Sequence, residues 1–211
     1  MLIEASLFDA ETESYEFDRS LIDQIALPVN DRYGDALFPG YFYQYAGMAR
    51  KYKPKRIYEV GARYGYIAIA MVAGVRANRG RPNTEYVGID DESYHHGSCA
   101  QANRNFAQVF PDVKMRAMYW NSFHGMPPDL GSFDFIHIDG NHDYHGVMND
   151  AMACWPWLNP GGIMLFDDAT VDSPIWEAIQ NFTAQFHSSP ESVEYHYQRN
   201  ERNHVYLRKA P

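Results

Sequence analysis

Two apolar segments of this chain each end on acidic residues, and a histidine lies between them. Residues 133–138 are followed by Asp139, and residues 162–166 are followed by Asp167 and Asp168. A segment of helical length and an Asn-Pro-Gly-Gly turn separate the two runs, so the pattern predicts strand, helix, turn and strand. Because parallel strands joined by a crossover helix have their carboxyl ends at one edge of the sheet, we expect these acidic side chains to lie side by side.

The residue types expected at this edge could bind a metal ion and accept a proton. Carboxylates brought together suit a hard divalent cation such as Mg²⁺, and His142 beside such an ion suits a general base. A structural alternative is that Asp139 and Asp168 each cap the helix that follows, which is a common role of aspartate. Capping would explain either acid alone, whereas the two strand ends together favour a site.

A glycine-containing turn follows an earlier expected strand, residues 56–60. Glu59, Gly61 and Gly65 give the spacing ExGxxxG, which is neither the GxGxxG of dinucleotide sites nor a phosphate-binding loop. Glycine after a strand lets the backbone approach a ligand, and the free N–H groups of the next helix can bind polar groups. A tight turn without a ligand explains this segment equally well on its own.

The next expected strand, residues 86–89, ends on Asp90 and Asp91. An acid at the end of the strand that follows a glycine-rich turn is well placed to accept hydrogen bonds from ribose hydroxyls. Asp90 ends the apolar run directly, so we assign the ribose to Asp90 and a solvated or helix-capping role to Asp91.

A third expected strand, residues 113–120, ends on polar and aromatic residues. Trp120 could stack on an adenine ring or line its site, and Asn121 or Ser122 could hydrogen-bond the edge of the ring. An ordinary turn at the end of a strand is the alternative for all three residues.

Length and composition limit the class of protein. A chain of 211 residues is long enough for one α/β domain with a substantial core. Acidic residues outnumber basic ones by 27 to 18, giving a formal charge of −9, so we do not expect a nucleic-acid partner. The start of the chain lacks a secretory signal, and no apolar run is long enough to span a bilayer, so a cytoplasmic protein without membrane attachment is expected.

The rest of the sequence pattern predicts how the chain divides into two segments and where the other helices and strands lie. Residues 1–40 are expected to form an amino-terminal extension or lid, and residues 41–211 the main domain. Helices are expected at 41–52, at 97–110 and from Pro174 onward, with a short helix around 19–25. Two segments separated by a turn-like stretch at 199–203 predict an antiparallel hairpin at the end of the chain.

Taken together, these motifs resemble the class I S-adenosylmethionine-dependent methyltransferases. More narrowly, they resemble a metal-dependent O-methyltransferase branch that includes macrocin and mycinamicin sugar methyltransferases and cephalosporin-hydroxylase-like proteins. The fold resemblance covers about residues 41–209, and the narrower one depends on Ile138, Asp139, Gly140, His142, Tyr144, Val147, Asp150, Trp155, Pro160, Gly161, Gly162, Asp167 and Asp168.

The resemblance implies an α/β fold, a Rossmann-like, doubly wound seven-stranded sheet in the order 3-2-1-4-5-7-6 with strand 7 antiparallel. It implies that Asp139, Asp167 and Asp168 hold Mg²⁺ or another divalent cation, with His142 as the base. The residues implied to contact S-adenosylmethionine are Glu59, Gly61, Ala62, Tyr64, Gly65, Asp90, Asp91, Trp120, Asn121, Ser122 and Asp139. Two positions depart from the usual pattern, since Asp167 stands where Glu is common and Asn121 where Asp is common.

The expected function is therefore methyl transfer from S-adenosylmethionine to a hydroxyl of a small molecule, such as a natural product. Similar enzymes often form homo-oligomers, and no residue here fixes a stoichiometry. One alternative is a zinc-dependent hydrolase, because His137, Asp139 and His142 form a local cluster that could bind Zn²⁺ and activate water. Another is a binding protein that keeps the cofactor fold without catalysis.

Overall fold

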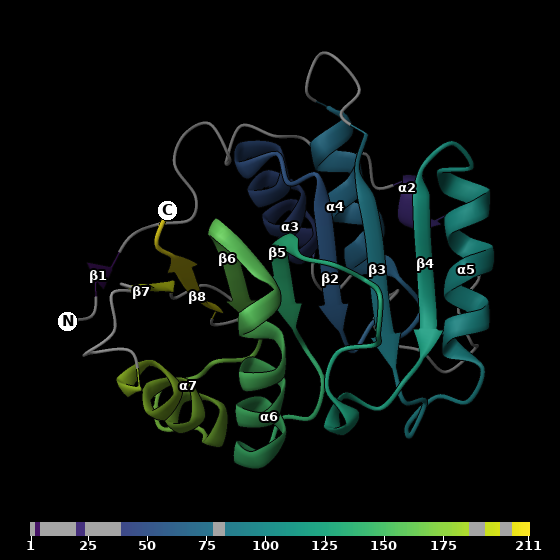
Figure 1. Ribbon diagram of the computed structural model, residues 1–211. Helices are drawn as coiled ribbons and strands as arrows, with labels where there is room; N and C mark the ends of the chain where they lie inside the picture. Colours follow the sequence, from purple (N-terminus) through teal and green to yellow (C-terminus); the bar gives the residue numbers. More distant parts are fainter. Residues whose placement is uncertain (1–2, 5–19, 24–38, 78–82, 186–192, 199–203) are drawn as a thin grey trace.

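The computed structural model of the chain describes residues 3–4, 20–23, 39–77, 83–185, 193–198 and 204–211, which form a sheet with helices on both faces (Figure 1). Most of the expected extension at residues 1–40 lies outside the described residues, as does the turn expected at 199–203. Among the helices that are described, none is long and apolar enough to cross a membrane.

The described residues form a sheet of eight strands in the order β1-β7-β8-β6-β5-β2-β3-β4. Of these eight, β8 alone runs antiparallel to its two neighbours, β6 and β7. Counted from β2, the order is the predicted 3-2-1-4-5-7-6 with strand 7 antiparallel, so the fold prediction is confirmed. The strands are β1 Ile3–Glu4, β2 Arg56–Val60, β3 Glu85–Asp90, β4 Lys114–Tyr119, β5 Phe133–Ile138, β6 Leu158–Phe166, β7 Val193–Gln198 and β8 His204–Lys209.

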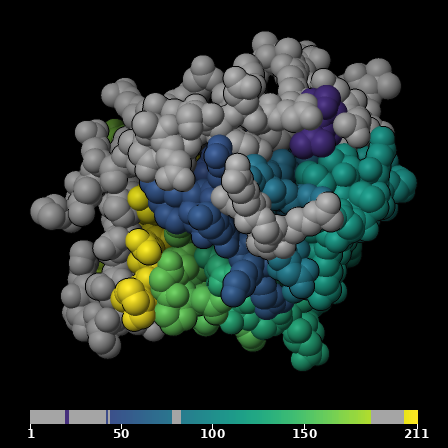
Figure 2. Space-filling view, turned by 90° about the horizontal axis from the view of Figure 1, so that it is seen from above, coloured from purple at the N-terminus to yellow at the C-terminus, as the bar shows by residue number. Residues whose placement is uncertain are grey.

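The helices cover the two faces of the sheet, each over its own apolar cluster. One cluster joins the sheet to α3, α4 and α5, and the other joins it to α6 and α7. The helices are α2 Ser20–Asp23, α3 Pro39–Tyr52, α4 Tyr66–Arg76, α5 Ser98–Val109, α6 Tyr144–Cys154 and α7 Pro174–Ala184, with 3₁₀ turns η2 Ser122–His124 and η3 Trp155–Trp157. Figure 2, seen from the amino ends of the parallel strands, shows α3 in blue at the surface.

The helices that follow β5 and β6 begin at residues other than the strand-end acids. The Asp143 side chain accepts a hydrogen bond from the Gly146 amide at 2.7 Å and caps α6. The Ser173 hydroxyl accepts one from the Trp176 amide at 3.1 Å and caps α7. The alternative in which Asp139 and Asp168 serve as the helix caps is therefore wrong, and the two side chains are left for another role.

The Asn-Pro-Gly-Gly segment, expected as a turn before the strand, instead lies within β6. Leu158 pairs with Phe133, and regular pairing with β5 resumes only between Ile163 and Phe135. The intervening residues form an irregularity rather than a separate turn. Asn159 is held there by a 2.8 Å hydrogen bond from its amide nitrogen to the Asp134 carboxylate.

Candidate functional site

A cavity of about 600 Å³ opens at the carboxyl ends of the central parallel strands. Its lining takes residues from the ends of β2, β3, β4, β5 and β6, the edge at which ligands bind in open α/β sheets. The predicted site residues that line it are Glu59, Gly61, Ala62, Asp90, Asp91, Trp120, Asn121, Ser122, Asp139, His142 and Asp168. Within the described part of the chain, three predicted residues, Tyr64, Gly65 and Asp167, do not line it.

The turn after β2 packs directly against the end of β5. Gly61 has a φ of +89°, and a Cβ added there would lie 1.9 Å from the carbonyl oxygen of Asp139. The amides of Gly61 and Ala62 both donate to the Ile89 carbonyl, at 2.9 and 3.0 Å. The amides of Gly61 and Ala62 are therefore already engaged, and a ligand at this turn would contact the backbone without receiving these two hydrogen bonds.

The Tyr64 carbonyl and Gly65 lie against α5, and neither residue lines the cavity. The Tyr64 carbonyl accepts a hydrogen bond from the Asn105 side chain at 2.9 Å. A Cβ on Gly65, whose φ is +84°, would lie 2.3 Å from the Phe106 ring. The second glycine of ExGxxxG thus allows a helix and a turn to pack closely.

Asp90 is fixed at the end of β3 by the backbone around it. Its two carboxylate oxygens accept hydrogen bonds from the amides of Arg63, at 2.9 Å, and Glu92, at 2.7 Å. Burial raises the pKa of Asp90, and these two hydrogen bonds act in the opposite direction. Asp91 accepts from the Ser93 amide at 3.0 Å and from the Asn121 side chain at 3.2 Å. Both acids are therefore held in fixed positions.

Trp120 is also held in a defined orientation, since its indole N–H donates to the Gly125 carbonyl at 2.9 Å. The sequence did not single out several other residues of the lining. Two are aromatic and largely exposed, Tyr94 at 85% and Phe123 at 58%. Arg63 and His95 also line the cavity. These residues lie in connections after strand ends, so the only available signal was their nearness to the motifs.

His142 lies between the acidic ends of the two strands. Its Nε2 is 3.2 Å from Oδ1 of Asp139, and its Nδ1 is 3.6 Å from Oδ2 of Asp168. The hydrogen bond to Asp139 raises the pKa of His142, against the effect of burial. The structure thus brings together three of the four residues predicted for the metal and the base.

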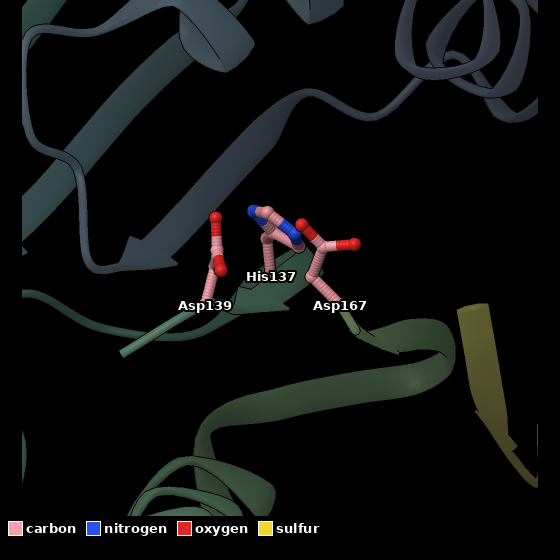
Figure 3. A group of neighbouring side chains, drawn as sticks. All are labelled: His137, Asp139 and Asp167. Atoms are coloured by element: carbon pink, nitrogen blue, oxygen red, sulfur yellow. The ribbon is translucent and has the colours of Figure 1, made fainter. Parts of the chain in front are cut away.

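Asp167, the fourth, turns into the protein. One ligand atom each from His137, Asp139 and Asp167 lies within 4.8 Å of the others, a spacing that could hold a metal ion. Figure 3 shows the His137 imidazole between the two carboxylates. Burial, together with the negative charge of Asp167, raises the pKa of Asp139 to about 6, and the hydrogen bond from His142 opposes this rise.

His137 is fully buried, as expected for a residue within the packed layer of the sheet. Its Nδ1 lies 2.8 Å from the Glu59 carboxylate, and its Nε2 lies 2.8 Å from the Tyr45 hydroxyl. Burial lowers the pKa of His137, but the hydrogen bond and charge of Glu59 outweigh it and the pKa is raised. Both ring nitrogens are thus engaged.

A further buried acid lies beneath the cavity. Asp150 in α6 is 1% exposed. A Cβ added to Gly140 would lie 2.9 Å from its Oδ2. Burial raises the pKa of Asp150 from 3.8 to about 6, against hydrogen bonds from Ser122 and Asn149. The folded protein therefore holds this proton more tightly than the unfolded chain does.

We predict that Asp150→Asn removes a pH-dependent loss of stability. The contribution of Asp150 is fully present below pH 3.8 and is lost as the pH rises through about 6, because the unfolded chain ionises first. The separation of the two pKa values limits the effect to about 3 kcal/mol. Denaturant unfolding of both proteins with a chelator, at about pH 4 and about pH 8, measures it. A difference between variant and wild type that is equal at both pH values would contradict the prediction.

Comparison with known proteins agrees with this fold. A family described as "Methyltransferase domain" matches residues 58–169, which is more than half of the chain. A curated relative, the uncharacterised protein y4gI of Sinorhizobium fredii, is 31% identical over 127 residues, or 56% of this chain. The chain spans only 14% of the length of that relative.

Solved structures share the fold at low sequence identity. The Podospora anserina methyltransferase PaMTH1, bound to S-adenosylhomocysteine, has a TM-score of 0.64 and 20% identity over 81% of this chain and 78% of its own. The Bacillus cereus O-methyltransferase, also with S-adenosylhomocysteine, has a TM-score of 0.61 and 16% identity over 91% of each chain. TomG from Streptomyces achromogenes, an O-methyltransferase in complex with S-adenosylmethionine, has a TM-score of 0.59 and 15% identity over 83% of this chain and 82% of its own.

The sheet order, the cavity at the carboxyl ends of its strands and the family match over residues 58–169 lead to one assignment. The chain belongs to the methyltransferase-domain family and has the class I S-adenosylmethionine-dependent methyltransferase fold.

Proposed function

We propose that this protein transfers the methyl group of S-adenosylmethionine to a hydroxyl of a small molecule, assisted by a divalent cation. The observation that carries the proposal is the position of His142 between Asp139 and Asp168, at the wall of the cavity that the predicted cofactor residues also line. A proton acceptor and the methyl donor would then share one space.

The donor would lie along the ends of β2, β3 and β4. Asp90, held by two backbone amides, would accept hydrogen bonds from the ribose hydroxyls. Trp120 would line the adenine ring, with its indole fixed by the Gly125 carbonyl. The methionine portion would pass the turn at Gly61, whose lack of a side chain lets this turn pack against the Asp139 backbone at the cavity wall. The sulfonium methyl group would then point toward His142.

The acidic residues fit a hard divalent cation. Asp139, Asp167 and Asp168 would supply oxygen ligands, which Mg²⁺ and similar ions prefer. Burial and the nearby charge of Asp167 raise the pKa of Asp139, and a bound cation would favour the ionised form of this carboxylate. A cation held by these residues would supply positive charge that makes a nearby hydroxyl more acidic.

The remaining chemistry would be performed by His142 and by positioning. His142 takes the hydroxyl proton, the acceptor oxygen forms a bond to the methyl carbon, and the bond from that carbon to sulfur breaks. The products are the methyl ether, S-adenosylhomocysteine and a protonated His142. Holding the oxygen and the methyl carbon in line would contribute much of the rate enhancement.

The acceptor is proposed to be a small molecule with an apolar or aromatic body. Tyr94 and Phe123 are the support, because two large aromatic side chains remain mostly exposed while lining the cavity. Exposed aromatic surface of this kind is typical of a site that binds an apolar ligand.

The hydrolase alternative has weaker support. A zinc site built on His137, Asp139 and His142 would require His137 to give up Glu59 or Tyr45, since both of its ring nitrogens are engaged. A non-catalytic binding protein would need neither His142 nor the acids beside it. The test below separates these alternatives from methyl transfer.

We predict that the purified protein methylates one or more members of a panel of phenols and of glycosides with an apolar or aromatic body, and that chelation with EDTA lowers the rate at least about 100-fold. Transfer of a radiolabelled methyl group measures the rate, and added Mg²⁺ should restore it. Methyl transfer that persists after chelation would exclude the role of the cation. Binding of the cofactor without transfer to any acceptor would favour a binding protein.

A further inference from the structure

Glu59 is a carboxylate that is buried in the core and also belongs to the cavity lining. It lies near the carboxyl end of β2, two residues before the turn at Gly61, and is 1% exposed. Each of its two oxygens has a donor. The Tyr86 hydroxyl donates to Oε2, and Nδ1 of His137 lies 2.8 Å from Oε1. Partners of this kind are what a buried charge requires.

The strand pairing explains how both donors reach the same carboxylate. Glu59 in β2 is paired with Gly88 in β3 on one side and with His137 in β5 on the other, and these three strands are neighbours in the sheet (Figure 1). Tyr86 lies two residues before Gly88 and therefore on the same face. A Cβ added to Gly88 would lie 2.5 Å from the Tyr86 hydroxyl oxygen. Glycine at this position thus leaves the space through which Tyr86 reaches Glu59.

The hydroxyl of Tyr86 acts on Glu59 rather than on the packing of the core. Tyr86 is fully buried, and burial together with the negative charge of Glu59 raises its pKa, so the hydroxyl keeps its proton and donates it. The ring packs edge-on against Phe106, with 5.4 Å between the ring centroids. A phenylalanine ring could make this ring contact equally well, but it could not make the hydrogen bond.

We propose that Tyr86 is a positioning residue that, with His137, fixes the Glu59 carboxylate where it meets the ammonium group of the methionine portion of S-adenosylmethionine. The inference rests on the proposed function, because it assumes that the methionine portion passes the turn at Gly61. Tyr86 and His137 are fully buried, and neither lines the cavity, so both hold the carboxylate from the core side. The negative charge of Glu59 at the cavity wall complements the ammonium group, and two donors hold it in one orientation.

The test compares two ligands that differ at one group. They are S-adenosylhomocysteine, which carries the ammonium group, and its analogue in which a hydrogen replaces the amino group. Without the Tyr86 hydroxyl, the carboxylate rotates or takes up a proton and meets the ammonium group less well. We expect Tyr86→Phe to raise the dissociation constant for S-adenosylhomocysteine about 10-fold or more, and that for the analogue by less than about twofold. Calorimetric titration measures both.

Tyr58→Phe is a matched control. Tyr58 is also a fully buried tyrosine, and its hydroxyl has no hydrogen-bond partner among the residues that the structure describes. It directly precedes Glu59 in β2 and therefore lies on the opposite face of the sheet. The same atom is removed from this second tyrosine, and both dissociation constants should stay within about twofold of wild type. Thermal unfolding of both variants shows that each is folded.

A second test asks whether Tyr86 acts through Glu59. Glu59→Gln keeps the shape of the side chain and removes its charge, so it should also weaken the binding of S-adenosylhomocysteine selectively. In that background, adding Tyr86→Phe should change the affinity by less than about twofold, because the charge that Tyr86 positions is already gone. Losses that multiply in the double variant would show that Tyr86 acts by another route, and the inference would be wrong.

The outcomes separate the inference from the proposed function. If wild type binds S-adenosylhomocysteine and Tyr86→Phe binds it equally well or more tightly, the positioning role is wrong and the cofactor site stands. An equal loss of affinity for both ligands would also contradict the inference, since it would indicate a general structural role for the hydroxyl. If wild type binds neither ligand, the cofactor site itself is wrong and the inference falls with it.

Discussion

Replacing His142 by alanine is expected to lower the rate of methyl transfer by about 100- to 10,000-fold, the usual contribution of a general base. The imidazole is the group placed between Asp139 and Asp168 at the cavity wall, and alanine cannot accept the hydroxyl proton. Because the His142 side chain is 47% exposed, its removal should leave the core intact. Single-turnover transfer of a radiolabelled methyl group measures the chemical step directly.

His145→Ala is the control for this prediction. His145 lies three residues further along the chain, is exposed and packs against the ring of Tyr144. It is not among the described residues that line the cavity. We expect this variant to keep its activity, and both variants to bind S-adenosylhomocysteine as wild type does. Near-normal transfer by His142→Ala would show that the proton leaves by another route.

The second large effect is expected at Gly61, where alanine should abolish measurable binding of S-adenosylhomocysteine. The new Cβ would lie 1.9 Å from the Asp139 carbonyl oxygen, so the turn or the end of β5 must move. In addition, the φ of +89° disfavours any residue with a side chain, by about 1–2 kcal/mol. Calorimetric titration with S-adenosylhomocysteine measures the loss, which we expect to exceed about 100-fold in the dissociation constant.

Gly97→Ala separates the clash from the backbone strain. Gly97 has a similar φ of +80°, but a Cβ there would meet nothing within 4 Å. This variant should lose about 1–2 kcal/mol of stability and keep its cofactor affinity. Unchanged binding by Gly61→Ala would mean that the methionine portion of the cofactor does not pass this turn.

The sheet and the grouping of the site were accessible from sequence because they follow from local patterns. Alternating apolar residues ending on Asp139 predict a strand, and Ser173 followed by proline predicts a helix start, where the structure places the Ser173 cap. The parallel geometry then brings Asp139 and Asp168 together, although 29 positions separate them in the sequence. No side-chain detail was needed for this step.

The buried polar contacts of Tyr45 could not be predicted in the same way. Tyr45 lies in an aromatic stripe that predicts core packing, and its ring is indeed fully buried. Its hydroxyl, however, meets His204, which is 159 positions away. A contact of this kind depends on how α3 and β8 pack on the sheet, and no spacing rule specifies it. Asp167 also turns inward, where its Oδ1 lies 2.9 Å from Nε2 of His204 in the neighbouring strand.

Irregular segments were the other part of the structure that could not be predicted from the sequence. The irregularity in β6 is accompanied by a hydrogen bond between Asn159 and Asp134 across two strands, which no local pattern specifies. The short β1 contributes two residues to the edge of the sheet and pairs with β7. Two residues are too few for the alternation of apolar and polar side chains that identifies a strand in sequence. Arg63 and His95 reach the cavity from connections that have no periodicity.

The central claim is that the cavity at the carboxyl ends of the strands binds S-adenosylmethionine beside a separate cation site. Calorimetric titration of the purified protein with S-adenosylhomocysteine, with Mg²⁺ and again after chelation, tests it most directly. We predict micromolar affinity in both conditions, because the proposed contacts of the cofactor at Gly61 and Asp90 need no cation, although Asp139 and Asp168 line the same cavity. No binding in either condition would contradict the assignment, and metal analysis for zinc would then be the next measurement.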